Sequence, residues 1–366
     1  MGGIVTLVLL AICILLHEYG HFLSARAKGI AVSEFFIGFG PKIYSFRRNN
    51  TEYGIKAILL GGYVKIPGMD QDEEVQGYKE KELFHTAKWQ NKLLISSSGI
   101  VINLLLAFCI LFIVLSTVGI SYPSLEIDSL GDSVSQREHA PSVEAGLKAG
   151  DIFISFNGIE LKDWDHLVEL IEKNPTKNVE IKYMRNKKIY TTTAYLDERV
   201  VDNAKSGYLG ISPIIKNDKL PFYKVMTNSF LVVFNMIELS IKSIITLFSP
   251  TNLYTLAGGL FGNFVPPEIR PLSPVGLAQA GQVIGNSGFV NILSLLAFVN
   301  VFLAVFNSIP IIPLDGGRVV LALIEGLTGK KISDRKLIPL ATLVVLVFIF
   351  LGVTALFLDI TQPINL

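Results

Sequence analysis

Four long apolar stretches dominate the pattern of hydrophobic and polar positions along the chain. They are residues 4–25, 93–115, 289–312 and 337–358. Each stretch is long enough to cross a bilayer as a helix, which takes about 20 residues. The segment 121–220 is polar by contrast, with strand-like runs and one amphipathic stretch, and is long enough for a small α+β domain. The pattern predicts an α-helical polytopic membrane protein with four spans and an inserted α+β domain.

Composition agrees with a membrane protein. Half of the 366 residues are hydrophobic and only 17% are charged, which is far more apolar than a soluble chain of this length. The formal net charge of +1 gives no excess of positive charge to attract a polyanion, so we expect no nucleic-acid partner. The expected partner is the lipid bilayer in which the spans lie. The first span is not expected to be a cleaved signal peptide, because no basic residue precedes it.

The first span carries the sequence His-Glu-Tyr-Gly-His from His17 to His21. Residues four apart in a helix lie one above the other, so the two imidazoles face one point, as two ligands of a tetrahedral metal do. Glu18 lies about 100° round the helix from His17 and is close enough to act as a general base without being a ligand. Ionisable residues within an apolar span are costly and therefore functional candidates. Two histidines that meet by chance are the alternative.

A carboxylate that could complete this site follows the third span. The sequence after Asn307 contains Pro310 and Pro313, which break a helix, and then Asp315-Gly316-Gly317. Two imidazoles and the Asp315 carboxylate would bind Zn²⁺ and leave a fourth position open. Glu18 would then move protons, and Asn307 would donate a hydrogen bond to the substrate carbonyl. A turn-forming Asp-Gly-Gly and a helix-bridging amide are the respective alternatives.

The direction of the spans follows from charge. Eleven basic residues lie between Arg26 and Lys92, which marks this loop as cytoplasmic and places the histidines toward the cytoplasmic end of their span. If Asp315 is to meet them, spans one and three must run in the same direction. We therefore expect residues 222–248, although apolar, to form a peripheral amphipathic helix and not a fifth span. The domains predicted are residues 1–120, 121–220, 221–288 and 289–366.

The loop between the first two spans contains strand-like runs on either side of Gly61-Gly62, which predict a β-hairpin. It is unusually apolar for a solvated loop and is expected to associate with the membrane. Two interpretations remain open. Gly61, Gly62, Tyr63 and Val64 would belong to an edge strand that pairs with an extended substrate, or the strands form an ordinary small sheet that covers the loop.

Several motifs in the same order resemble the site-2 protease family, of the bacterial regulator-of-sigma-E protease type. They are HEYGH, GGYVKIPG, a PDZ-like run EAGLKAGDIFISFNGIEL, SPVGLAQ and NSIPIIPLDGG. By this resemblance His17, His21 and Asp315 are the zinc ligands, Glu18 the base, Asn307 a substrate-positioning residue, and the 61–66 region a membrane re-entrant β-loop. The chain departs from the family in showing one PDZ-like region where the enterobacterial form has two, and in having Ile100 after Gly99 where Pro is frequent.

The resemblance implies zinc-dependent intramembrane proteolysis of single-span membrane proteins, such as anti-sigma factors or signal-peptide remnants, in the bacterial inner membrane. The PDZ-like domain would lie on the extracytoplasmic side. A non-catalytic membrane scaffold that presents a PDZ domain is the alternative from another class, and Glu18 argues against it, because a scaffold has no need of that residue. A transporter is a third possibility, but no inverted repeat is evident.

Overall fold

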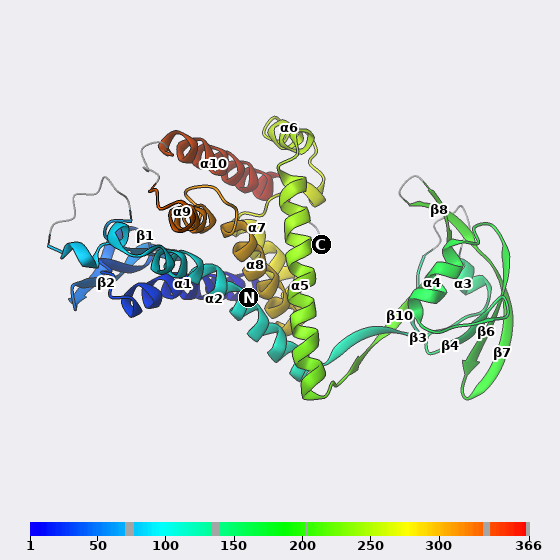
Figure 1. Ribbon diagram of the computed structural model, residues 1–366. Coiled ribbons are helices and arrows are strands. Elements are labelled where there is room, and N and C mark those ends of the chain that lie inside the picture. The colour runs from blue at the N-terminus through cyan, green and yellow to red at the C-terminus, as the bar shows by residue number, and fades with distance from the viewer. Residues whose placement is uncertain (70–76, 133–138, 202–203, 332–336, 364–366) are drawn as a thin grey trace. The chain divides into compact units, whose positions relative to one another are not determined.

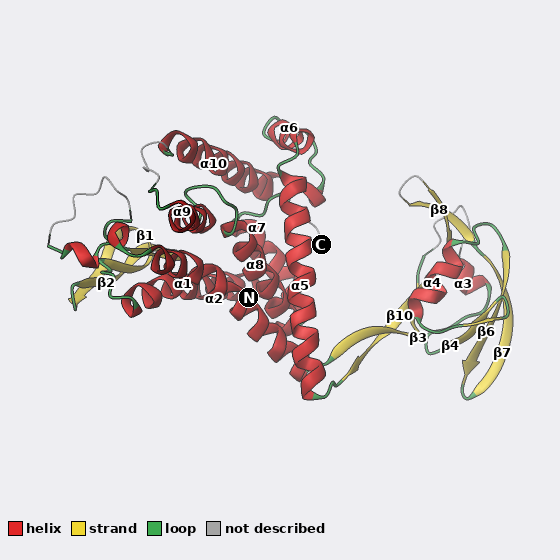
Figure 2. Ribbon diagram, in the orientation of Figure 1, coloured by secondary structure: helices red, strands yellow, loops and turns green. Residues whose placement is uncertain are grey.

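The computed structural model describes residues 1–69, 77–132, 139–201, 204–331 and 337–363. The chain forms two compact units. One consists of Met1–Leu115 with Pro221–Leu366, and the other of Ser116–Leu220. Figure 2 shows that the first unit is almost entirely helical, with one small β-structure, and that strands dominate the second.

Long apolar helices make up most of the first unit (Figure 1). Those with the length and composition of a membrane span are α1 (Gly2–Ala27), α2 (Trp89–Thr117), α5 (Phe222–Leu247), α8 (Phe289–Asn307) and α10 (Ile338–Thr361). Shorter helices are α6 (Pro250–Gly259), α7 (Pro274–Asn286) and α9 (Asp315–Thr328), and short 3₁₀ turns are Glu80–Glu82, Phe84–Thr86 and Pro267–Ile269. Several apolar helices in one chain, with large exposed hydrophobic side chains along them, are typical of a multi-pass membrane protein.

Helix α5 differs from the other long helices. By length and apolar composition it qualifies as a span, which makes five such helices in the described residues where the sequence analysis expected four. In Figure 1, however, α5 runs crosswise to α10, whereas membrane-spanning helices tilt from the bilayer normal by about 20° on average. The crosswise direction favours a helix that lies along the bilayer surface, and the peripheral position of α5 stays a prediction.

The β-structure of the first unit consists of β1 (Glu34–Arg48) and β2 (Thr51–Lys65). The hairpin turn is at Asn49-Asn50, where both residues have positive φ, and not at Gly61-Gly62 as predicted. The glycines instead bend β2, with φ +96° at Gly61, so that β2 pairs with both sides of β1: Phe35 is opposite Tyr53 and also Val64. Asn tolerates the left-handed conformation that a two-residue hairpin needs, which is why the turn forms at Asn49-Asn50.

The second unit has a sheet with strand order β10-β3-β4-β6-β7, and β5 pairs with β4. The strands are β3 (Ile120–Leu130), β4 (Ile152–Phe156), β5 (Ile159–Glu160), β6 (Asn178–Arg185), β7 (Lys188–Tyr195) and β10 (Ile211–Asp218). A separate pair joins β8 (Asp197–Val201) to β9 (Ala204–Tyr208), and the helices are α3 (Pro141–Glu144) and α4 (Trp164–Glu172). The apolar face of α4 packs on the sheet, where Leu167 and Ile171 meet Phe153 and Phe156 in one core.

Candidate metal centre

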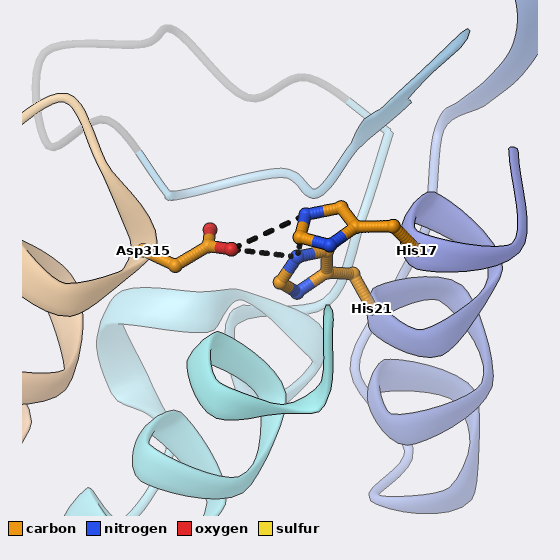
Figure 3. Close-up of side chains that lie close together, drawn as sticks. All are labelled: His17, His21 and Asp315. Carbon is orange, nitrogen blue, oxygen red and sulfur yellow. Dashed lines mark hydrogen bonds and ion pairs between the residues drawn. The ribbon is translucent and has the colours of Figure 1, made fainter. Parts of the chain in front are cut away.

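Two imidazoles and one carboxylate converge between α1 and α9 (Figure 3). His17 and His21 lie one turn apart on α1 and are buried, and Asp315 is the first residue of α9. The Nε2 atoms of the two histidines are 3.4 Å apart, and each lies 3.3 Å from Oδ2 of Asp315. The sequence therefore brings together, from two distant segments, three side chains that can each offer a ligand atom to one ion.

The spacing of these atoms fits zinc. The edge of a tetrahedron is about 1.6 times the distance from its centre to a corner, so zinc bonds of about 2.0–2.1 Å place neighbouring ligands about 3.3–3.4 Å apart. The three donor atoms have these separations. Oδ2 of Asp315 is buried and has no hydrogen-bond partner among the described residues. Burial of an unpaired carboxylate oxygen is costly unless a cation binds it. The donor set and its geometry suit Zn²⁺.

Helix α2 fixes the ring of His21. Nδ1 of His21 lies 2.7 Å from the carbonyl oxygen of Ile95. A carbonyl only accepts, so Nδ1 carries the proton and Nε2 presents its lone pair toward Asp315 and His17. This second partner of the ring sets both its tautomer and its orientation.

Gly99 of α2 lies against both imidazoles. A Cβ at this position would be 2.4 Å from Nε2 of His21 and 2.7 Å from Nε2 of His17, so only glycine leaves room for the rings and for an ion between them. The sequence analysis did not single out this residue as part of the site. The signal available was the run of small residues from Ser96 to Gly99, which is typical of close helix approach.

The start of α9 places the carboxylate of Asp315. Anionic side chains are stabilised at a helix N-terminus by the unpaired backbone N–H groups and the helix dipole. The two following glycines allow the first turn to pack directly on the preceding segment, because a Cβ on Gly316 would lie 2.4 Å from the carbonyl of Ser308 and one on Gly317 would lie 2.6 Å from Ile311. The Asp-Gly-Gly sequence thus supplies a carboxylate followed by two residues without side chains, which the close packing of the first turn of α9 on the preceding segment requires.

Glu18 and Asn307, the other predicted side chains, are outside the three-residue cluster. The carboxylate of Glu18 is half-buried and its Oε2 accepts a hydrogen bond of 3.2 Å from the backbone N–H of Val64 on β2. Asn307 is the half-buried last residue of α8.

The model of peptidase family M50 matches residues 5–352. The chain belongs to this family. It is the site-2 protease family that the sequence motifs resemble, so that prediction is confirmed. Among relatives of this M50 protein, the zinc metalloprotease Rip1 of Mycobacterium tuberculosis is 28% identical over 408 residues, covering 100% of this chain and 98% of its own. The chloroplastic membrane metalloprotease ARASP of Arabidopsis thaliana is 27% identical over 327 residues, covering 87% of this chain and 69% of its own.

One solved structure resembles a part of this M50 chain. The PDZ domain of the SdrC-like protein from Listeria monocytogenes covers 26% of this chain and 92% of its own, with 20% sequence identity and a TM-score of 0.21. That score carries no conclusion about the fold. The PDZ-like character of Ser116–Leu220 stays a prediction.

The predicted substrate-binding residues of the M50 protein, Gly61, Gly62, Tyr63 and Val64, lie on the part of β2 that is nearest to α1. A Cβ on Gly61 would be 3.4 Å from Ile14, and one on Gly62 would be 3.6 Å from Leu15. Residues 62–65 pair with residues 34–37 on one side, and on the other side Val64 donates to Glu18. This segment is therefore a strand edge beside the helix that carries the histidines.

Tyr63 is held in the sheet by its hydroxyl, which donates to the carboxylate of Glu34 and accepts from Nζ of Lys56 at 2.8 Å. Burial and the neighbouring Glu34 carboxylate raise the pKa of Tyr63, so the hydroxyl keeps its proton and the hydrogen bond is maintained at neutral pH.

Proposed function

We propose that this protein is an intramembrane zinc endopeptidase that cleaves transmembrane segments of single-span membrane proteins. The observation that carries the proposal is the triangle of His17, His21 and Asp315 donor atoms, with tetrahedral spacing, on helices of a multi-pass membrane protein. Membership of peptidase family M50 favours a protease over a scaffold or a transporter. Anti-sigma factors and signal-peptide remnants, which the family resemblance implies, are the proposed substrate classes.

The proposed roles follow from the geometry. His17, His21 and Asp315 hold the ion, and Zn²⁺ supplies Lewis acidity and a water-derived nucleophile at neutral pH. Glu18 takes a proton from the attacking water and later gives it to the leaving amine. Asn307, half-buried at the end of α8, would donate to the substrate carbonyl as charge develops on its oxygen.

We also propose that the substrate binds at the strand edge of β2, because this edge lies beside the helix that carries the histidines. An extended peptide that pairs with residues 61–64 would lie beside α1, where Glu18 contacts Val64. Strand addition holds a peptide through its main chain and is tolerant of its side chains. It also unfolds the substrate locally, which is needed because the peptide bonds of a regular helix are already hydrogen-bonded and shielded.

The decisive test combines metal content and activity. We expect the purified full-length protein to contain about one zinc per chain, and the His17→Ala and Asp315→Ala variants to lose it. Cleavage of a tagged single-span substrate should stop when a chelator removes the metal and return when zinc is added. An active metal-free protein, or zinc retained at full occupancy in both variants, would refute the proposal.

The second unit is proposed to gate access of the substrate from the extracytoplasmic side. The support is its position between spans as a compact unit of Ser116–Leu220, with β10 at the edge of its sheet. Just before β10, the backbone N–H groups of Leu209 and Gly210 donate no hydrogen bond to the backbone of a described residue, and a peptide that adds to that edge would accept from them.

Deletion of this unit checks the gating role. With residues 121–220 replaced by a short flexible linker, full-length substrates should be cleaved without the earlier trimming that gating by the intact protein would impose, while the rate on trimmed substrate stays within about twofold. Measuring both rates side by side controls for damage to the membrane unit. Unchanged selectivity between long and trimmed substrates would count against gating.

A further inference from the structure

Helices α2 and α9 contact each other directly at one end, and at the other end both lie against the two histidines of α1. At one end, Gly99 of α2 lies against the imidazoles that meet Asp315, the first residue of α9. At the other end, the ring of Trp89 near the start of α2 lies against Gly326 near the end of α9, where a Cβ would be 2.5 Å from the indole. Residue numbers rise along α9 as they fall along α2, so the two helices are antiparallel between these points.

The contacts have matching spacings along the two helices. Trp89 and Gly99 are separated by ten residues, or about 15 Å of helix, and Asp315 and Gly326 by eleven, or about 16 Å. Eleven residues are close to three full turns, so Asp315 and Gly326 occupy one face of α9. That face also carries the buried Ala322. One face of α9 therefore has the carboxylate at its beginning and the contact with α2 at its end.

A buried ion pair joins the same two helices beside the tryptophan. Nζ of Lys92 on α2 lies 2.6 Å from Oε2 of Glu325 on α9, and the two side chains are only 9% and 18% exposed. Lys92 is seven residues, or two turns, from Gly99 and lies on the same face of α2. Oε1 of Glu325 also lies 4.0 Å from Nζ of Lys331, so Lys92 is the charge that depends on this pair. Moving either helix along the other would leave the Lys92 ammonium desolvated and unpaired, and the pair therefore has one preferred geometry.

Helix α9 depends on such contacts for its position. The segment 308–314 before it is irregular, so α8 does not extend rigidly into α9. Arg318, one turn after Asp315, donates to the carbonyl of Met69 at 3.0 Å, and this adds an attachment to the segment after β2. The pair of Lys92 and Glu325 is the ionic attachment of α9 to the helix that also fixes His21 through Ile95.

We propose that Lys92 and Glu325 are a positioning pair for the metal centre. By setting the register of α9 against α2, they place Oδ2 of Asp315 at the correct distance from the two histidine Nε2 atoms, although neither residue touches the site. This inference rests on the proposed function, namely that His17, His21 and Asp315 bind zinc. It assigns to the pair an effect on metal affinity and coordination geometry beyond any effect on stability.

The test uses the full-length protein in detergent with Lys92→Met, Glu325→Gln and the charge exchange of Lys92→Glu with Glu325→Lys. Zinc affinity is measured by competition with a chromogenic chelator, and Co²⁺ replaces zinc so that its visible absorption bands report tetrahedral geometry. We expect each single variant to bind zinc more weakly, by about tenfold, the low end of the effect of losing a group that hydrogen-bonds a ligand directly, and to lose intensity in the cobalt bands. The exchange, which restores opposite charges, should recover most of both.

Lys242→Met is the matched control. It breaks the pair of Lys242 and Glu238 on α5, whose atoms are also 2.6 Å apart but whose side chains are 69% and 58% exposed, and it should leave affinity and spectrum unchanged. Glu325→Gln keeps the shape of the side chain and serves if Lys92→Met fails to fold.

The outcomes separate the two proposals. Wild-type protein that binds neither zinc nor tetrahedral cobalt would refute the proposed function itself. If the wild type binds both, but the single variants match it, or the exchange recovers nothing, the positioning pair is overturned and the metalloprotease proposal stands.

Discussion

Replacing Glu18 with Gln should lower the rate of substrate cleavage by about 10²–10⁴-fold, which is the range that general acid–base catalysis contributes. The amide cannot take the proton from the attacking water or return one to the leaving amine. Metal content should not change, because Glu18 is not one of the three residues whose ligand atoms meet. The measurement is the single-turnover rate on a tagged transmembrane substrate, with zinc determined on the same preparation.

The Gln side chain is a suitable isostere at this position. Its carbonyl oxygen can accept the hydrogen bond from the N–H of Val64 that Oε2 of Glu18 accepts, so the contact of α1 with β2 is kept. Glu238→Gln on the exposed face of α5 is the control and should cleave at the wild-type rate. A Glu18→Gln protein of full activity would exclude this carboxylate as the base.

The parts of the site that sequence predicted best are those that depend on local geometry. His17 and His21 face one point because they are four residues apart in a helix, which requires nothing beyond that helix. The prediction of Asp315 as the third ligand depended on its chemistry and on the family resemblance, because local structure alone does not predict that it lies beside the histidines. The structure places all three donor atoms within 4.8 Å of one another.

The elements that sequence placed less well depend on tertiary packing. The sequence pattern predicts the hairpin turn at Gly61-Gly62, but these glycines bend β2 against α1, and Asn49-Asn50 makes the turn. Hydropathy describes α5 as a span as readily as a surface helix, because apolar content does not encode the direction of a helix. Lys92 counted as one of the basic residues of a cytoplasmic loop, yet it is buried in α2 and paired with Glu325.

Replacing Gly99 with Ala should weaken zinc binding by about a hundredfold or more, while the protein stays folded. The added methyl group would lie 2.4 Å from Nε2 of His21 and 2.5 Å from Cε1 of His17, well inside van der Waals contact, so the rings must move. His21 can rotate only by giving up its hydrogen bond to Ile95. Either movement breaks the triangle of donor atoms that matches a tetrahedral ion.

The unfolding temperature of the metal-free protein distinguishes a specific loss of zinc binding from a general loss of stability. Within a helix, Ala is more favourable than Gly by roughly 0.5–1 kcal/mol, so the metal-free variant should unfold at a temperature near that of the metal-free wild type. Gly352→Ala on α10 is the matched control, because a Cβ there would meet nothing within 4 Å, and it should keep both zinc and activity. A Gly99→Ala protein with wild-type zinc affinity would mean that α2 does not limit the space around the imidazoles, and the close fit between α1 and α2 would then have no part in building the metal centre.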